Sequence, residues 1–391
     1  MNNQISAKSN IGEHVVLFTL IRTVINSAYR MVYAMQPLLA ASIGVNLGDL
    51  AVALSIRSLL GSFSPFLATF TDTYGRKKGM LFGMTLFTLG MGITAVLQSF
   101  IGFIIGASLV VVGNGVFIPS MQSYLSDYVP FERRGKILSI TELSWSMGFI
   151  LGAPALGVLL TRIDWIAPHI VLTVIGLLLM LIFWRIIPAD TSKKIKQPLL
   201  QNLGLALRSA PVLAGVAASI SSTGANEVVN MVFGEWIKDS FGLAFATLTI
   251  ASVVIGGSEL ASELLSALIL DRVSKQKAIT VALIINALSS LALPFTKQSL
   301  TLTLIALSAI FISFEFFLIG LITLMSEVLP AARASVMAVI IATFSAGRVF
   351  GALFGAQLYQ ISFLAICLTA VALDVFAAFL VQKIYLTESK K

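Results

Sequence analysis

Long apolar runs alternate with short polar connections along the whole chain. A helix needs about 20 apolar residues to cross a bilayer, and the runs have this length. They are too long and too evenly apolar to be strands of a membrane barrel. The pattern predicts an all-α integral membrane protein with twelve transmembrane helices, at about 14–39, 48–71, 79–98, 101–125, 137–160, 167–188, 211–236, 243–270, 277–295, 299–325, 333–358 and 362–384.

Composition supports the membrane prediction and removes one competing class. Of 391 residues, 57% are hydrophobic and 11% are charged, whereas soluble domains carry about 25% charged residues. Taken alone, the net charge of +8 is typical of a nucleic-acid binder, but the positions of the charged residues along the chain favour another explanation. They gather in the connections, where topology explains them, so no nucleic-acid partner is expected. The first 13 residues are polar and the first apolar run can span, so we expect no cleavable signal peptide.

The cations predict an orientation. Most of the 26 Lys and Arg residues fall in one alternate set of connections. The opposite set contains only Arg162, Lys238 and Lys297. Short basic loops stay in the cytoplasm. We therefore expect both termini in the cytoplasm and a multi-pass protein of the cell membrane.

An internal repeat predicts two halves. The segment LSDYVPFER at 125–133 recurs as MSEVLPAAR at 325–333, and the segment 68–78 has a weaker echo at 267–277. Two matches at nearly one offset indicate duplication of a six-helix unit. We predict a six-helix bundle at 1–188, a cytoplasmic linker at 189–209 and a second six-helix bundle at 210–391, related as pseudo-repeats.

Two motifs carry a resemblance to a known family. The segment 68–78 reads Ala-x-x-x-Asp-x-x-Gly-Arg-Lys-Lys. It resembles the loop between spans 2 and 3 of major facilitator superfamily transporters, where Gly usually replaces Ala68. Gly148-x-x-x-Gly152-x-Pro154-x-x-Gly157 resembles a span 5 motif noted in that family's exporters, although Ala153 interrupts the usual Gly-Pro. The same features also suit an ordinary basic loop and ordinary helix packing.

The resemblance implies a fold and a gate. Members of the family place a substrate site between two halves that rock in alternating access. The family's aspartate that matches Asp72 holds the cytoplasmic gate. On this basis the expected gating residues are Asp72, Gly75, Arg76, Asp127 and Arg133, with a lesser latch at Asp271.

Polar residues inside the first-half spans are candidate substrate contacts. They step mostly by three or four along span 1, which puts them on one helix face. Arg22 and Glu142 lie at matched depth, so we predict a buried pair if spans 1 and 5 are neighbours. Arg57 is a candidate for an anionic substrate group. The candidates are Arg22, Asn26, Arg30, Tyr33 and Arg57, and a buried structural network is the alternative.

The second half carries acidic residues in its spans. Glu259 and Glu263 lie one turn apart, so repulsion favours a proton on one of them. Glu227, Glu259, Glu263 and Glu315 are therefore candidate proton-coupling groups, with Asn226, Glu227 and Glu315 also candidate substrate contacts. Pairing with Arg348 or a silent structural role is the alternative.

The function expected from these features is transport. The sequence has no nucleotide-binding glycine loop, no cysteine–histidine metal cluster and no nucleophile–base pair, so we expect no cofactor, no metal and no enzyme activity. We expect a monomer that exports an amphipathic or drug-like molecule in exchange for protons. A proton-coupled importer of a nutrient or anion, using Arg30 and Arg57, is one alternative. A membrane sensor that does not transport is another.

Overall fold

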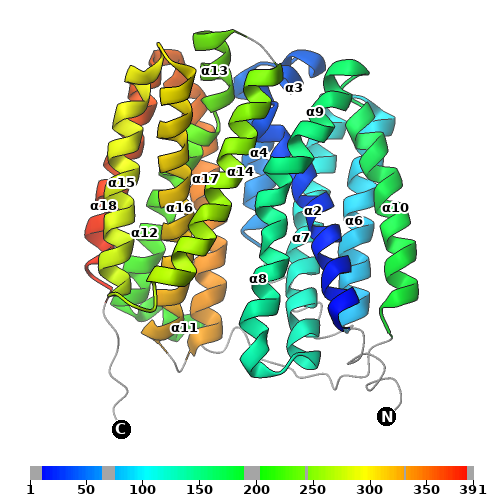
Figure 1. The fold of residues 1–391 in the computed structure, drawn as a ribbon, viewed down its shortest axis with the longest axis horizontal. Helices are drawn as coiled ribbons and strands as arrows, with labels where there is room; N and C mark the ends of the chain where they lie inside the picture. The colour runs from blue at the N-terminus through cyan, green and yellow to red at the C-terminus, as the bar shows by residue number, and fades with distance from the viewer. Residues whose placement is uncertain (1–10, 64–74, 189–202, 243–244, 330–331, 385–391) are drawn as a thin grey trace. The chain divides into compact units, whose positions relative to one another are not determined.

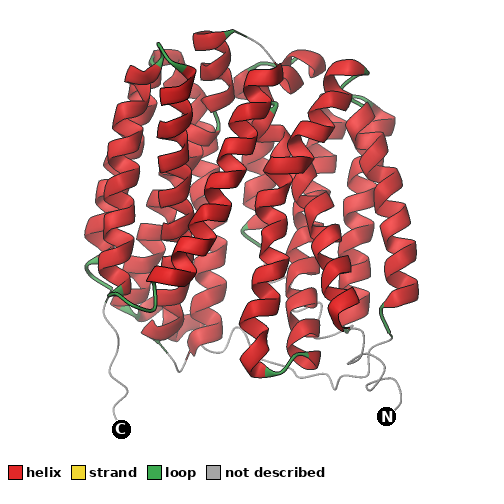
Figure 2. Ribbon diagram, in the orientation of Figure 1, coloured by secondary structure: helices red, strands yellow, loops and turns green. Residues whose placement is uncertain are grey.

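The chain is helical throughout the described residues of a computed structural model, which are 11–63, 75–188, 203–242, 245–329 and 332–384 (Figures 1 and 2). Ten helices in these ranges are long and apolar enough to cross a membrane, and eleven are if one bent helix pair counts as a span. Helix α12 (Ala210–Asn230) occupies the seventh predicted span. The all-α, multi-pass prediction is confirmed.

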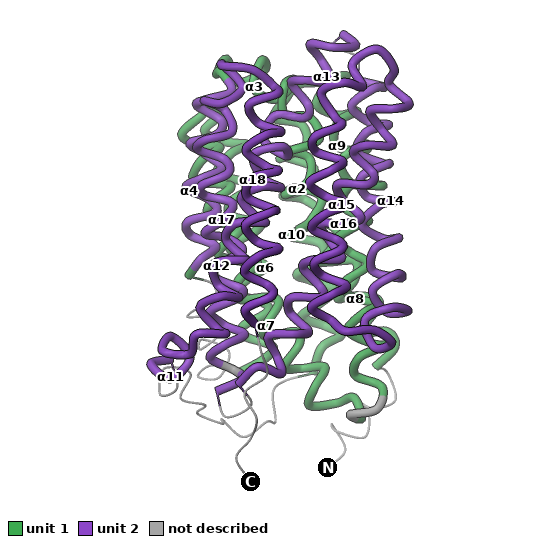
Figure 3. The backbone as a smooth tube through the Cα atoms, turned by 90° about the vertical axis from the view of Figure 1, so that its left-hand side faces the viewer, with its two compact units in different colours: residues 1–46, 63–197 green, residues 47–62, 198–391 purple. Residues whose placement is uncertain are grey.

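The helices form two compact units (Figure 3). Unit 1 comprises Met1–Asn46 and Phe63–Gln197, and unit 2 comprises Leu47–Ser62 and Pro198–Lys391. Helix α4 (Leu47–Gly61) falls in unit 2 because it packs along α17 (Arg333–Ile361). A six-helix division at 189–209 stays a prediction.

Unit 1 contains most of the first-half spans. Its described elements are α2 (Ile11–Ala34), α3 (Gln36–Ile43), α6 (Arg76–Leu97), α7 (Phe100–Tyr128), α8 (Phe131–Met147), a π-helical segment (Gly148–Gly152), α9 (Ala153–Arg162) and α10 (Ala167–Ile186). The predicted first span is interrupted at Met35, because α3 restarts with Pro37 in its first turn. Proline has no N–H to donate, so the first turn of a helix accommodates it without the loss of a hydrogen bond.

Unit 2 has a continuous apolar core. Its other elements are α11 (Leu203–Arg208), α13 (Phe233–Phe241), α14 (Phe245–Ile269), α15 (Lys275–Ala292), a 3₁₀ turn (Leu293–Thr296), α16 (Leu300–Val328) and α18 (Phe363–Val381). Buried side chains such as Val212, Phe317, Leu321, Ile340 and Val381 join α12, α16, α17 and α18. The predicted seventh span stops earlier than expected, at Asn230, and α13 follows as a separate short helix.

The repeat inferred from the sequence is visible in matching helices. Helices α7 and α16 each have 29 residues and begin and end 200 positions apart. Each begins at a serine cap, with Ser99 Oγ accepting from Gly102 N at 3.2 Å and Ser299 Oγ accepting from Leu302 N at 3.4 Å. Such caps satisfy one of the unpaired N–H groups of a first helical turn. The duplicated sequence therefore forms duplicated local structure.

Candidate functional site

An ion pair joins α2 to α8 within unit 1. Arg22 Nη1 donates to Glu142 Oε1 at 2.7 Å, and Nη2 donates to Oε2 at 2.8 Å. Nη1 also donates to Thr141 Oγ1 at 3.3 Å. The Arg22 side chain is 4% exposed and that of Glu142 is 43% exposed. The predicted ion pair is confirmed, but only its arginine is buried, and the two parallel bonds fix the guanidinium plane.

The contact between the same helices continues one turn further along α2. Asn26 Nδ2 donates to Ser144 Oγ at 3.2 Å, and Ser144 Oγ donates to the Thr141 carbonyl at 2.6 Å. The π-helical segment then lets its glycines meet α2. A Cβ on Gly152 would lie 2.4 Å from Ser27 Cβ, so this approach requires a residue without a side chain. The polar face of α2 is thus built into the packing of unit 1.

Arg30 lies between two aromatic rings. Its Cζ atom is 3.6 Å from the ring centroid of Trp145 and 4.2 Å from that of Phe149. These rings are four residues apart, on the end of α8 and in the π-helical segment. The two cation–π contacts fix the position of the guanidinium, whose N–H donors lie in its own plane. Tyr29 adds a third ring, 5.8 Å from Trp145 between centroids.

The sequence prediction identified Arg30 and missed its aromatic partners. Trp145 and Phe149 were not singled out, although large aromatic residues spaced four apart beside a glycine-rich stretch were a usable signal. Tyr33, also predicted, is buried on α2. Its ring centroid is 6.0 Å from that of Tyr29. Arg57, the last of the substrate candidates predicted in the first-half spans, is buried on α4, which belongs to unit 2.

Helix α12 carries the corresponding polar stretch of unit 2. Its buried residues include Thr223, Asn226, Glu227 and Asn230. Glu227 packs against a glycine of α17, because a Cβ on Gly351 would lie 2.5 Å from Glu227 Cβ. Among the described residues, no group bonds to Asn226 Nδ2 or to Asn230 Oδ1. Buried amide atoms usually have partners, so these two are candidate contacts for a polar ligand.

The other acidic candidates lie on separate helices of unit 2. Glu259 is buried on α14, and Glu263 and Glu315 are half-buried on α14 and α16. A further acidic residue, Asp374 on α18, accepts a bond from Ser222 Oγ at 3.1 Å and so joins α18 to α12. The predicted proton-coupling set is thus spread over three helices.

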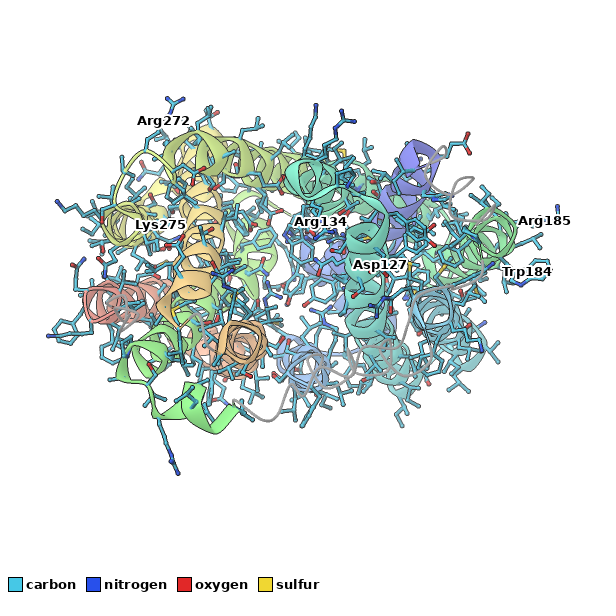
Figure 4. The ribbon with its side chains drawn as sticks, turned by 90° about the horizontal axis from the view of Figure 1, so that it is seen from below. Asp127, Arg134, Trp184, Arg185, Arg272 and Lys275 are labelled. Atoms are coloured by element: carbon cyan, nitrogen blue, oxygen red, sulfur yellow. The ribbon has the colours of Figure 1, made fainter. Side chains whose placement is uncertain are left out.

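The basic motif organises one end of unit 1 (Figure 4). Gly75 precedes α6 with a φ of +101°, in the region that favours glycine. Arg76 Nε donates to Asp127 Oδ2 on α7 at 3.3 Å. Lys77 Nζ donates to the carbonyls of Trp184, at 2.8 Å, and Ile187, where α10 ends. The motif therefore ties the start of α6 to the ends of α7 and α10.

The structure describes only one of the two remaining gating residues predicted for unit 1, and that residue takes no part in these contacts. Asp72 lies outside the described residues. Arg133 is exposed, and its neighbour Arg134 makes the local contacts instead. Arg134 Nε donates to the Val129 carbonyl at 3.0 Å and its Nη2 donates to the Ser126 carbonyl at 2.6 Å, which closes the turn between α7 and α8. Figure 4 shows Arg134 and Asp127 at this end of unit 1.

Unit 2 repeats the same connections with different side chains. Lys275 Nζ donates to both oxygens of Glu327, at 3.0 and 3.2 Å, where unit 1 has the single bond from Arg76 to Asp127. Gln276 Nε2 donates to the Ile384 carbonyl beyond α18, as Lys77 does to the end of α10. Asp271, predicted as the latch of this half, is exposed. The counterpart contacts of the motif are thus carried by Lys275 and Gln276.

Comparison with known proteins places these features in a family. The sequence matches the profile of the Major Facilitator Superfamily over residues 17–225 and 212–391. It is 31% identical over 119 residues to the uncharacterized MFS-type transporter YwfA of Bacillus subtilis, which is 30% of this chain and 29% of that relative. It is 30% identical over 102 residues to multidrug resistance protein 3 of Bacillus subtilis, which is 26% of this chain and 20% of that relative.

A solved structure supports the same fold. The crystal structure of a D-xylose-proton symporter superposes with a TM-score of 0.76 at 13% identity, covering 94% of this chain and 97% of that one. At this identity the likeness concerns the fold alone. The matched segments of both Bacillus relatives span less than a third of their lengths.

Proposed function

The chain belongs to the Major Facilitator Superfamily, and from that premise we propose that it exports an amphipathic organic molecule in exchange for protons. The observation that carries the proposal is a pair of polar stretches buried in apolar helices. One is the ring-sandwiched Arg30 on α2, and the other is the unsatisfied amide pair of Asn226 and Asn230 on α12. Polar groups in membrane spans are costly and mark substrate pathways.

The proposed substrate contacts follow from the chemistry of these groups. The rings of Trp145 and Tyr29 suit the flat apolar part of an amphiphile. For the polar part of a substrate, each unit offers its own candidate group: the in-plane donors of Arg30 in unit 1, and the amides of Asn226 and Asn230 in unit 2. Multidrug resistance protein 3, whose segment matches this chain, supports a substrate of that kind.

Glu227 is the proposed proton carrier of first choice. It is buried on α12 three residues before Asn230, on the same helix face, so its charge would act on a substrate held by that amide. Glu259, Glu263 and Glu315 are further candidates. A carboxyl group that gains and loses a proton during the cycle links proton flow to substrate flow.

The ion pairs at the motif end are proposed to act in gating. Arg76–Asp127 and Lys275–Glu327 join the start of one helix to the end of the next in each unit. Interactions of this kind that form in one state and break in another give a carrier two stable arrangements. Asp72 and Asp271 are proposed to take part, with both termini in the cytoplasm.

The test is transport by purified protein in liposomes that contain a pH-sensitive dye. Addition of ethidium, a flat lipophilic cation, to wild-type vesicles is expected to move protons. Glu227→Gln removes the titrating group and is expected to abolish the pH change, while Asn226→Leu lowers ethidium flux. Glu235→Gln is the matched control, because Glu235 on α13 forms a local i,i+3 pair with Lys238 at 2.6 Å.

Three outcomes separate the candidate functions. Ethidium flux without a pH change, unaltered by Glu227→Gln, would refute the proposed coupling. Proton-linked uptake of a sugar or anion that requires Arg30 and Arg57 would favour the importer, a function carried by the D-xylose-proton symporter of similar fold. Ligand-induced stabilisation without flux of any probe would favour a sensor.

A further inference from the structure

A long apolar groove lies on the outer face of unit 2, between α14, α15 and α16. Its volume is about 620 Å³, within the range of about 300–1,000 Å³ typical of ligand sites. The walls are aliphatic side chains such as Leu265, Ile269, Val281 and Ile285, all of them more than a third exposed. Figure 1 shows these three helices side by side at the front of unit 2.

The groove is a built feature of the fold. Small residues, Ala278, Ala282, Ala309 and Ser313, form much of its floor and leave the hollow. Hydrogen bonds keep its walls in place on either side. Ser262 Oγ on α14 donates to the Ile312 carbonyl at 2.7 Å, and Asn286 Nδ2 on α15 donates to the Ile310 carbonyl at 2.8 Å.

The length of the groove matches one leaflet. It runs along α15 from Lys277 to Ile285, which is about 12 Å at 1.5 Å per residue. Half of a bilayer's hydrocarbon core measures about 15 Å. One acyl chain lying along the helices would therefore fill the groove from the membrane surface to near the midplane.

A cation lies where a lipid headgroup would be. Lys277 lines the groove at the end that meets the connection between α14 and α15, and Arg272 in that connection is exposed. Figure 4 shows Arg272 extending away from unit 2 at its outer edge. Lys275 forms an ion pair with Glu327, which leaves the charges of Lys277 and Arg272. The exposed carboxylate of Asp271 offsets one of these two positive charges. Lys277 is thus the cation best placed to meet a phosphate.

We propose that this groove holds one acyl chain of an anionic phospholipid, with its phosphate bound by Lys277 and Arg272. The site is separate from the proposed substrate contacts and requires only that unit 2 spans a membrane. A second apolar groove of about 450 Å³, between α12, α17 and α18, offers an internal comparison. Its described lining residues include no lysine or arginine, so we expect it to bind the acyl chains of anionic and neutral phospholipids equally well.

The test is native mass spectrometry of the purified protein with phosphatidylglycerol or phosphatidylcholine of identical acyl chains. Wild type is expected to bind one phosphatidylglycerol about fivefold more tightly, since one cation near an anionic lipid surface contributes about 1 kcal/mol. Lys277→Gln should remove that preference. Lys297→Gln, an exposed lysine at the opposite end of the helix pair, is the matched control and should retain it.

Filling the groove tests the acyl part of the proposal. Ala309→Phe should lower the binding of both lipids in the groove between α14, α15 and α16. If phenylalanine at this position prevents folding, Ala278→Leu is the alternative variant. Equal affinity of wild type for both lipids would overturn the proposal. So would an equal loss in the Lys277 and Lys297 variants, or displacement of phosphatidylglycerol by equimolar ethidium, which would assign the groove to the transported compound.

Discussion

The two helices of the pair α6–α7 in unit 1 contact each other differently from those of the counterpart pair α15–α16 in unit 2. In unit 1 the backbones meet at two reciprocal glycine contacts. A Cβ on Gly113 would lie 2.5 Å from Gly83 O, and one on Gly106 would lie 2.6 Å from Gly90 O. Small residues let membrane helices approach this closely.

In unit 2 the equivalent positions carry side chains. The repeat has an offset of 199 residues between α6 and α15 and of 200 between α7 and α16, so Gly83 corresponds to Ala282 and Gly113 to Ser313. Here Asn286 joins the helices by donating to the Ile310 carbonyl and to Ser313 Oγ, at 2.8 and 3.1 Å. Ala282 and Ser313 then line the apolar groove. A duplicated helix pair thus has a close glycine contact in one copy and, with alanine and serine at the equivalent positions, an apolar groove in the other.

The largest expected effect comes from adding a carbon to the glycine contact. Gly113→Ala places a Cβ against the Gly83 carbonyl, which is backbone and cannot rotate away. Overpacking of this kind costs about 1–3 kcal/mol, so the melting temperature of the detergent-purified protein should fall clearly. Scanning fluorimetry provides the measurement.

Gly257→Ala on α14 is the matched control for that substitution. A Cβ at Gly257 has no neighbour within 4 Å, so alanine should be neutral or slightly stabilising through its higher helix propensity. If Gly113→Ala and Gly257→Ala shift the melting temperature equally, the glycine contact does not hold α6 against α7.

A smaller effect is expected from the amide that joins α15 to α16. Asn286→Leu removes both bonds and leaves the Ile310 carbonyl and Ser313 Oγ without this donor. Hydrogen bonds between membrane helices contribute about 1–2 kcal/mol at most, so stability should fall by less than with Gly113→Ala. Ser299→Ala, at the exposed cap of α16, is a control for a lost bond outside the helix contact. A shift no larger than that of Ser299→Ala would contradict the bridging role.

The smallest effect concerns the motif end, where unit 1 has Lys77 and unit 2 has Gln276. Both bond to carbonyls at a helix end, but only the lysine adds a charge that complements the helix dipole. Lys77→Gln should therefore cost about 0.3–1 kcal/mol, and the loss should shrink at high salt. Gln276→Lys should be neutral or stabilising. A loss that is independent of salt would show that the bond, and not the charge, matters there.

The amount that could be predicted from the sequence differs between the fold and the site. Apolar runs, loop charges and the repeat at 125–133 and 325–333 predicted helices, their order and their duplication, because a bilayer restricts the chain to spanning helices. The Arg22–Glu142 pair was also predictable, since matched depth brings two costly charges together. Trp145 and Phe149 were not found, because an apolar aromatic residue in a span has no charge to mark it.

The sequence by itself determined that this is a helical membrane protein of two related halves and which of its spans carry charge. Those features depend on local composition and on the cost of placing charge in hydrocarbon. Only the tertiary structure decided which faces meet: the rings around Arg30, the partner of Asp374, and the groove over Ala282 and Ser313. Lipid tails are as apolar as leucine, so hydrophobicity does not choose a helix's neighbour in a membrane. Close packing and hydrogen bonds make that choice, and they depend on residues far apart in the chain.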